Sequence, residues 1–219
     1  MSNLVKKGHT KALVILGDVR KSRMIADRTL AQAGLRQVVE RINGEKPGLL
    51  DVPFSISGGD EIQGVLTDPA DMVAVIDCLD LSSFIFGFRF GVGWGTVATP
   101  RASRSWEMDG ECFHKAREAI SRGKKEKRWV TVAGFGNDSD RILDGIFRIM
   151  QVIREGWTKK QRLAVATRKT KVTQTATAEE MGLDDSTLSK MLKAARFQQI
   201  VEMEETLPLL IRKLLEKAP

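Results

Sequence analysis

The pair Gly58-Gly59 separates two short runs of alternating polarity, and no other feature constrains the fold as strongly. The runs are VPFSIS before the pair and DEIQGVL after it. Side chains alternate between the two faces of a strand, and glycine readily takes the positive φ angles of a two-residue hairpin turn. The sequence therefore predicts an antiparallel hairpin, with Asp60 opening its second strand and Glu61 pointing to the opposite face.

Strands and helices alternate on both sides of this hairpin. Short apolar runs predict strands in KALVILGDV (11–19), FRFGVGWGTVAT (88–99) and RWVTVAGFG (128–136). Apolar residues spaced three and four apart predict helices within 28–43, 67–81 and 109–125. The order β-α-β-β-α-β-α-β predicts a mixed α/β (α+β) domain, with helices on one or both faces of a single sheet.

Composition excludes several classes of protein. Hydrophobic residues make up 42% of the 219, which suits a globular protein, and no apolar run approaches the ~20 residues of a membrane span. The first residues do not resemble a signal peptide, and Cys78 and Cys112 lack metal-ligand spacing. We therefore expect a cytoplasmic protein that does not associate with membranes.

The positive charge is concentrated in the last third of the chain. The net charge is +7, and residues 154–196 contain ten basic and five acidic residues. Such an excess is typical of a surface that binds a polyanion, although a solvated basic face explains it equally well.

A long amphipathic segment separates two predicted domains. Residues 1–136 form the α/β domain, 137–156 a connecting helix, and 157–219 a small all-α domain. The connecting helix carries one apolar stripe, made of Ile142, Ile146, Ile149, Met150 and Ile153. This stripe has three possible uses: packing on the sheet, bridging the domains, or pairing with a second chain. We expect a homodimer.

The segment TATAEEMGLDDSTLSKMLKAARFQQ (175–199) resembles a helix-turn-helix. A small residue, Ala178, is followed four residues later by Gly182, which can take a left-handed turn conformation, and Leu188 lies six residues further on. In such motifs the second helix enters the major groove of duplex DNA. The predicted DNA-binding residues are Ser186, Thr187, Ser189, Lys190 and Lys193.

A bundle of this shape can equally serve protein contacts. Upstream, Trp157 and Leu163 are expected in the core of a supporting helix. The last apolar segment, ETLPLLIRKLL (205–215), is expected to form an amphipathic helix used for packing or for a dimer contact.

Two carboxylates are expected at one end of the sheet. Asp18 closes the first predicted strand, and Asp60 opens the strand after the hairpin. If those strands are neighbours, the two acids supply the hard oxygen ligands that suit Mg²⁺, which completes its shell with phosphates and water. Alternatively, the cations of RKSR (20–23) pair with Asp60 and Glu61 and leave no room for a metal.

Several of these motifs together resemble those of a known family. Gly58-Gly59-Asp60-Glu61-Ile62 resembles the GGDEF signature of an adenylyl-cyclase-like palm domain. Asp18, GVGWG (91–95) and DG…ARE (109–118) stand in the order that this superfamily uses. With its C-terminal part, the whole chain resembles the SatD-like family. The resemblance implies a ferredoxin-like palm of the nucleotide-cyclase type, followed by a helix-turn-helix domain.

The resemblance also implies site residues. Asp18 and Asp60 would be catalytic and would hold Mg²⁺ or Mn²⁺ against a nucleotide triphosphate, with Lys124 on a phosphate. Glu61 is a further metal candidate. The candidates for nucleotide binding are Val19, through its main-chain carbonyl, and Arg23, Gly58, Gly59 and Arg117. Ala26 replaces the asparagine that reads guanine in diguanylate cyclases, so guanine specificity is not expected.

Three functions follow from these observations. The leading one is a DNA-binding regulator whose N-terminal domain binds a nucleotide with a divalent metal. The alternative is a metal-dependent nucleotidyl cyclase or nucleotidyltransferase. The third is a protein-interaction adaptor without either activity.

Overall fold

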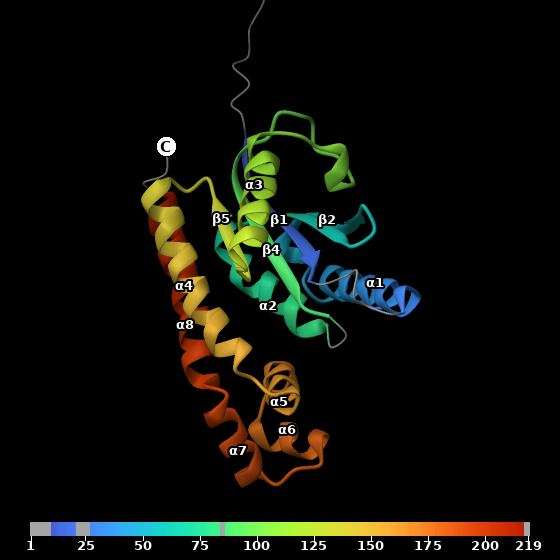
Figure 1. The fold of residues 1–219 in the computed structure, drawn as a ribbon, viewed down its shortest axis with the longest axis vertical. Helices are drawn as coiled ribbons and strands as arrows, with labels where there is room; N and C mark the ends of the chain where they lie inside the picture. Colours follow the sequence, from blue (N-terminus) through green and yellow to red (C-terminus); the bar gives the residue numbers. More distant parts are fainter. Residues whose placement is uncertain (1–9, 21–26, 84–85, 217–219) are drawn as a thin grey trace, which may run out of the picture.

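The computed structural model describes residues 10–20, 27–83 and 86–216, which form a five-stranded sheet flanked by helices (Figure 1). The strands are β1 (Lys11–Val19), β2 (Leu50–Ser57), β3 (Glu61–Leu66), β4 (Phe88–Thr96) and β5 (Val130–Ala133). They are arranged in the order β2-β3-β1-β4-β5, and only the pair β4–β5 is parallel. The predicted mixed α/β fold is confirmed.

Helices occupy the predicted intervals. The α/β part contains α1 (Arg28–Glu45), α2 (Met72–Ser82) and α3 (Glu111–Glu126), with the short 3-10 helices η2 (Pro47–Leu49), η3 (Pro69–Asp71) and η4 (Ser105–Glu107). It is followed by α4 (Asn137–Glu155), α5 (Lys159–Thr170), α6 (Gln174–Met181), α7 (Asp185–Ala194) and α8 (Phe197–Leu215). The domain boundaries expected near 136 and 156 stay predictions.

β1 lies at the centre of the sheet and separates two hydrophobic cores, because its side chains alternate between the faces. Leu13 and Ile15 belong to a core that includes buried residues of α1 and α2. Val14 and Leu16 belong to a second core that they share with α3. α3 therefore covers one face of the sheet, and α1 and α2 cover the other.

Glycines in β4 allow α3 to approach the sheet closely. A Cβ atom at Gly93 would lie 2.1 Å from the carbonyl oxygen of Cys112, and one at Gly91 would lie 2.4 Å from that of Ala116. No side chain fits at either position. The GVGWG segment thus has a packing role that is independent of any ligand.

The two glycines of the hairpin turn have the predicted positive φ angles, but the turn is one residue longer than the expected two, because Ser57 pairs with Glu61. Gly58 and Gly59 have φ angles of 66° and 94°, in the region that favours glycine. Asp60 lies in the turn, and β3 begins at Glu61. The expectation that Asp60 opens the strand is therefore wrong by one residue.

α4 is rotated relative to the predicted apolar stripe. Met150 is buried, whereas Ile142 and Ile149 are exposed. Polar groups account for the difference: Asp144 accepts a hydrogen bond from the Val132 backbone N–H, and Gln151 accepts one from that of Trp129. These groups satisfy the outer edge of β5, and so they fix which face of α4 points inward.

The C-terminal helices make a small core of their own and also return to the main one. Ala164, Ala178 and Leu188 pack together, whereas Leu163 is 44% exposed, so its prediction as a core residue is wrong. The amphipathic segment at 205–215 lies in α8, which packs into the large core through Leu207 and Ile211. Among the described helices, none combines the length and apolar character needed to cross a bilayer.

Candidate functional site

The end of β1 and the start of β3 bring two acidic residues to the same face of the sheet. Asp18 lies opposite Glu61 in the antiparallel register, and directly opposed residues share a face. The Val19 N–H donates to the main-chain carbonyl of Asp60 at 3.2 Å, which ties β1 to the hairpin turn. Asp18 thus shares its face with Glu61, and the link to Asp60 runs through the main chain.

Three cations surround this pair of acids. Lys124 Nζ lies 3.0 Å from Asp18 Oδ1, and Arg89 Nη1 lies 3.6 Å from Asp18 Oδ2. Arg117 Nη2 lies 3.6 Å from Glu61 Oε1. Lys124 and Arg117 are seven residues apart on α3, and this spacing returns to the same helix face after two turns. The five side chains form the group that we name the palm-face cluster.

Burial shifts the pKa of two groups in this cluster. Burial raises the pKa of Glu61, the cations Arg117 and Lys124 oppose that shift, and Asp18 and Asp60 add to it. Burial also lowers the pKa of Arg89, because its charge is partly withdrawn from water. Glu61 therefore holds its proton to a higher pH than an exposed glutamate does.

The palm-face cluster does not fit Mg²⁺ as it stands. Both oxygens of Asp18 face cations, so a divalent ion has to displace Lys124 and Arg89. Among the described residues, no three His, Cys, Asp or Glu side chains gather as a metal-binding group. Two acids and three cations on one face favour an anion such as a phosphate. Divalent metal stays a prediction, and we derive no chemical step from it.

The remaining residues predicted around this site are placed as follows. Gly58 and Gly59 are both exposed at the hairpin tip. Arg20 Nη2 lies 3.4 Å from Glu155 Oε1 at the end of α4. Arg23 lies outside the described residues.

α6 and α7 meet at a tight turn, and the residues predicted to bind DNA lie on the outside of α7. Gly182 has a φ angle of 64°, and the Asp184 carboxylate accepts a hydrogen bond from the Thr187 N–H, which caps α7. Leu188 and Leu192 are buried. The exposed residues of α7 include Ser186, Thr187, Ser189, Lys190 and Lys193.

A buried ion-pair network joins the helices, and the sequence analysis missed it. Arg154 of α4 contacts Asp77 and Asp80 of α2 and also Glu204 of α8. From α5, Lys169 contacts Asp77 and Glu204, while Arg162 contacts Asp80. The signal was present, because two acids in the apolar stretch VAVIDCLDL need partners when that helix is buried.

This network absorbs part of the positive charge counted in the sequence. Arg154, Arg162 and Lys169 belong to the basic segment 154–196, yet they neutralise acids inside the molecule. Burial opposes ionisation of Asp77, but Arg154 and Lys169 hold its pKa below the usual value. The basic excess of the last third is therefore smaller at the surface than in the sequence.

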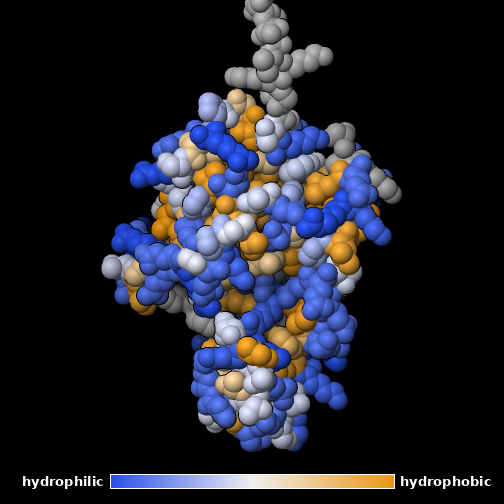
Figure 2. All heavy atoms as spheres, turned by 180° about the vertical axis from the view of Figure 1, so that it is seen from behind, coloured by the Kyte–Doolittle hydropathy of each residue, from blue (hydrophilic) through white to orange (hydrophobic). Residues whose placement is uncertain are grey.

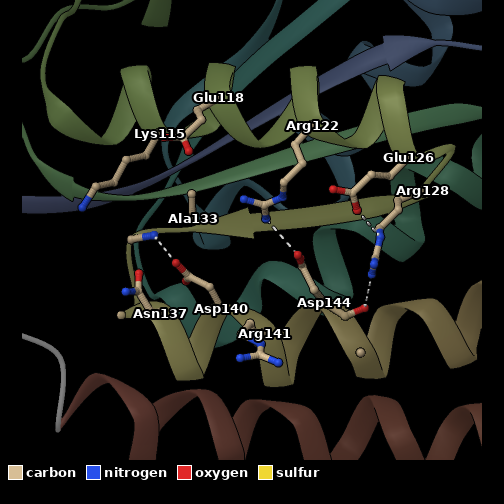
Figure 3. A pocket seen from close by; sticks show the side chains of 13 residues that line it. Lys115, Glu118, Arg122, Glu126, Arg128, Ala133, Asn137, Asp140, Arg141 and Asp144 are labelled. Atoms are coloured by element: carbon tan, nitrogen blue, oxygen red, sulfur yellow. Dashed lines mark hydrogen bonds and ion pairs between the residues drawn. The ribbon is translucent and has the colours of Figure 1, made fainter.

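A cavity of about 800 Å³ lies between α3, β5 and α4 (Figure 3). Arg122 donates to the Val132 carbonyl and to Asp144, and Asp140 accepts from the backbone N–H groups of Gly134 and Phe135. Figure 3 shows Arg122 of α3 and Asp144 of α4 directed at each other, with Asp140 directed at the backbone that follows β5. The charged side chains that line this cavity are largely paired with one another or with the backbone of β5 and the residues after it. We therefore assign no ligand to the cavity.

Comparisons with known proteins identify a family and give weak structural similarities. The model of the SatD family matches residues 12–206. No curated protein matches the sequence. A bacterial light-regulated adenylyl cyclase aligns with 56% of this chain and 74% of its own, at 11% identity and a TM-score of 0.42. A regulator of polyketide synthase expression from Bifidobacterium adolescentis aligns with 94% of this chain and 83% of its own, at 15% identity and a TM-score of 0.27. At these TM-scores neither similarity supports an argument about activity.

Proposed function

The chain belongs to the SatD family, and from that premise and its own geometry we propose that it is a regulator that binds duplex DNA through α7. Its α/β part carries the palm-face cluster, which we propose as the site of a nucleotide or another phosphate ligand. The observation that carries the DNA proposal is the arrangement of α6, Gly182 and α7.

The two faces of α7 have different chemistry. Leu188 and Leu192 fix the helix against α5 and α6, so the opposite face is held outward. That face carries hydroxyl groups and two lysines, Lys190 and Lys193, which suit base edges and phosphates. Seen from behind, hydrophilic side chains predominate over the end of the molecule formed by the C-terminal helices (Figure 2).

Two features of α7 limit the number of DNA contacts. The Thr187 hydroxyl donates to Asp184, so this side chain is partly engaged in the helix cap. Asp184 and Asp185 also place negative charge at the end of the helix that would approach the groove. The proposal therefore rests mainly on Ser186, Ser189 and the two lysines.

The test is fluorescence anisotropy with a library of genomic duplex fragments at two salt concentrations. If Lys190 and Lys193 each contact a phosphate, replacing both by alanine should reduce the salt slope by roughly 0.9 per contact. The matched control is Arg28→Ala with Arg36→Ala, two exposed cations of α1. The proposal fails if the wild-type chain binds no duplex at low salt, or if control and test variants weaken binding equally. An adaptor without either activity then becomes the better description.

The phosphate-ligand proposal rests on a separate observation, the convergence of Lys124 and Arg117 on the acids at the ends of β1 and β3. In a ligand complex these cations would exchange carboxylate for phosphate oxygens, which form strong charge-assisted hydrogen bonds. Calorimetric titration with nucleotide triphosphates, with and without Mg²⁺, tests this. Turnover to a cyclic or transferred product would support the nucleotidyl cyclase or nucleotidyltransferase alternative.

A further inference from the structure

The outer face of α4 carries apolar side chains that the fold of a single chain does not bury. Ile142, Ile149 and Val152 are 48%, 60% and 62% exposed. Together with Gly145 they follow spacings of three, four and three residues, the a/d pattern of a helix-to-helix seam. We name these four residues the α4 stripe.

The rest of α4 is already engaged, so the stripe cannot turn inward. Leu143, Phe147 and Met150 lie in the large core. Asp144 and Gln151 bond to the edge of β5, as described above. α8 lies alongside α4 on the side away from β5 (Figures 1 and 3). These contacts on two sides hold the stripe at the surface.

We propose that the α4 stripe is the interface of a homodimer in which two α4 helices cross in antiparallel orientation. Gly145, which also lines the cavity between α3, β5 and α4, leaves an open notch between Ile142 and Ile149, because a Cβ atom added there would meet no atom within 4 Å. When the twofold axis is level with Phe147, Ile149 of one copy lies over Gly145 of the partner. Ile142 then lies beside Val152 of the partner. One face supplies both knob and notch, as a twofold interface requires.

The charges beside the stripe are complementary in this orientation. Arg141 flanks one end of the stripe and Glu155 the other. In an antiparallel pair with its axis level with Phe147, Arg141 of one copy lies two residues, about 3 Å along the helix, from the level of Glu155 of the partner, an offset that both long side chains span. Within the described part of the chain, Arg141 makes no hydrogen bond or ion pair. Glu155 is 48% exposed, and in its own chain its Oε1 lies 3.4 Å from Arg20 and accepts a hydrogen bond from Gln151. Arg148 would lie near the twofold axis, but it reaches back to Gln151 Oε1 at 3.2 Å.

The first experiment measures the dimer dissociation constant of the full chain by sedimentation equilibrium. Gly145→Glu fills the notch with a charged side chain and improves helix propensity, so the monomer keeps its fold. We expect it to raise the dissociation constant by roughly 30-fold or more, the loss typical of a central contact. The control is Val172→Glu, at an apolar residue that is 95% exposed in the α5–α6 connection, and it should leave the constant unchanged.

The second experiment tests the antiparallel register by charge exchange. Arg141→Glu and Glu155→Arg should each weaken the dimer by roughly 3- to 10-fold, and the double variant should regain most of the loss. Circular dichroism confirms that each variant is folded. The proposal is overturned if the wild type is monomeric up to about 100 μM, above the dissociation constant of a specific interface of ordinary size. It is also overturned if the dimer survives Gly145→Glu, or if the double variant is no tighter than the single ones.

Discussion

Lys124 Nζ lies 3.0 Å from Asp18 Oδ1, and this contact joins the last turns of α3 to the end of the central strand. The resemblance implied that both residues serve one ligand, the aspartate through a metal and the lysine through a phosphate. In the structure they bind each other. A ligand therefore has to replace this ion pair, and the competition can be measured.

Removing the charge of Lys124 should make Asp18 more available to a divalent ion. We expect Lys124→Gln to bind Mn²⁺ more tightly than the wild type, because one cation that occupies an Asp18 oxygen is gone. Electron paramagnetic resonance of free Mn²⁺ measures the affinity, and Lys125→Gln is the control at an exposed neighbour. Adding Asp18→Asn should abolish the gain; if it does not, the ion binds elsewhere.

Arg154 should be the side chain whose truncation costs most stability in the buried network. Arg154→Ala leaves Asp77, Asp80 and Glu204 with less compensation inside the protein, which typically costs about 3–5 kcal/mol. Urea denaturation gives the free energy of unfolding. Arg148→Ala, on the exposed side of the same helix, should change it by no more than about 0.5 kcal/mol. Equal losses would show that the network is not specifically stabilising.

The raised pKa of Glu61 predicts a pH dependence with a definite sign. The folded protein binds a proton at Glu61 at a higher pH than the unfolded chain, whose value is near 4.5. This contribution to stability is fully present below pH 4.5 and is lost as the pH rises through the higher, folded-state pKa. Relative to Glu61→Gln, the wild type should therefore gain stability as the pH falls from neutral. Parallel pH profiles from urea denaturation would contradict this.

Substituting Gly93 should disrupt the contact between β4 and α3. In Gly93→Ala the new Cβ would lie 2.1 Å from the Cys112 carbonyl oxygen, so α3 has to move away from the sheet. We expect a loss of about 1–3 kcal/mol or more in the free energy of unfolding, the usual cost of overpacking. Gly48→Ala is the control, because an added Cβ there meets no atom within 4 Å. An unchanged Gly93→Ala protein would show that α3 adjusts without strain.

Mutations on the two faces of α7 should differ in their effect on stability, because one face is buried and the other is exposed. Leu188→Ala should lower stability by about 2–5 kcal/mol, the usual cost of a core cavity, since this side chain is fully buried. Lys190→Ala should change stability by no more than about 0.5 kcal/mol, because its side chain is exposed. Thermal and urea unfolding measure both variants. A tolerant Leu188 would argue against the α5–α7 core described above.

Local sequence rules determined the elements and much of the register. Apolar spacing located the strands and helices, and Gly58-Gly59 set the hairpin turn, because backbone conformation and side-chain alternation depend on neighbouring residues. The same rules placed Gly182 at the turn before α7. Local rules did not single out Lys124; only the family resemblance implied that it serves the same ligand as Asp18.

Only the tertiary structure decided which polar groups meet, because ion pairs and edge contacts join residues far apart in the sequence. Helical spacing grouped the α4 isoleucines into one apolar stripe and left its use open. Hydrogen bonds from β5 to Asp144 and Gln151 decided that Ile142 and Ile149 face outward. Counting charges assigned Arg154 and Lys169 to a basic surface. In the structure both form ion pairs with Asp77 in the interior. A buried acid pairs with whichever cation the fold places next to it. Spacing along the chain does not predict that distance, because the partners belong to different helices.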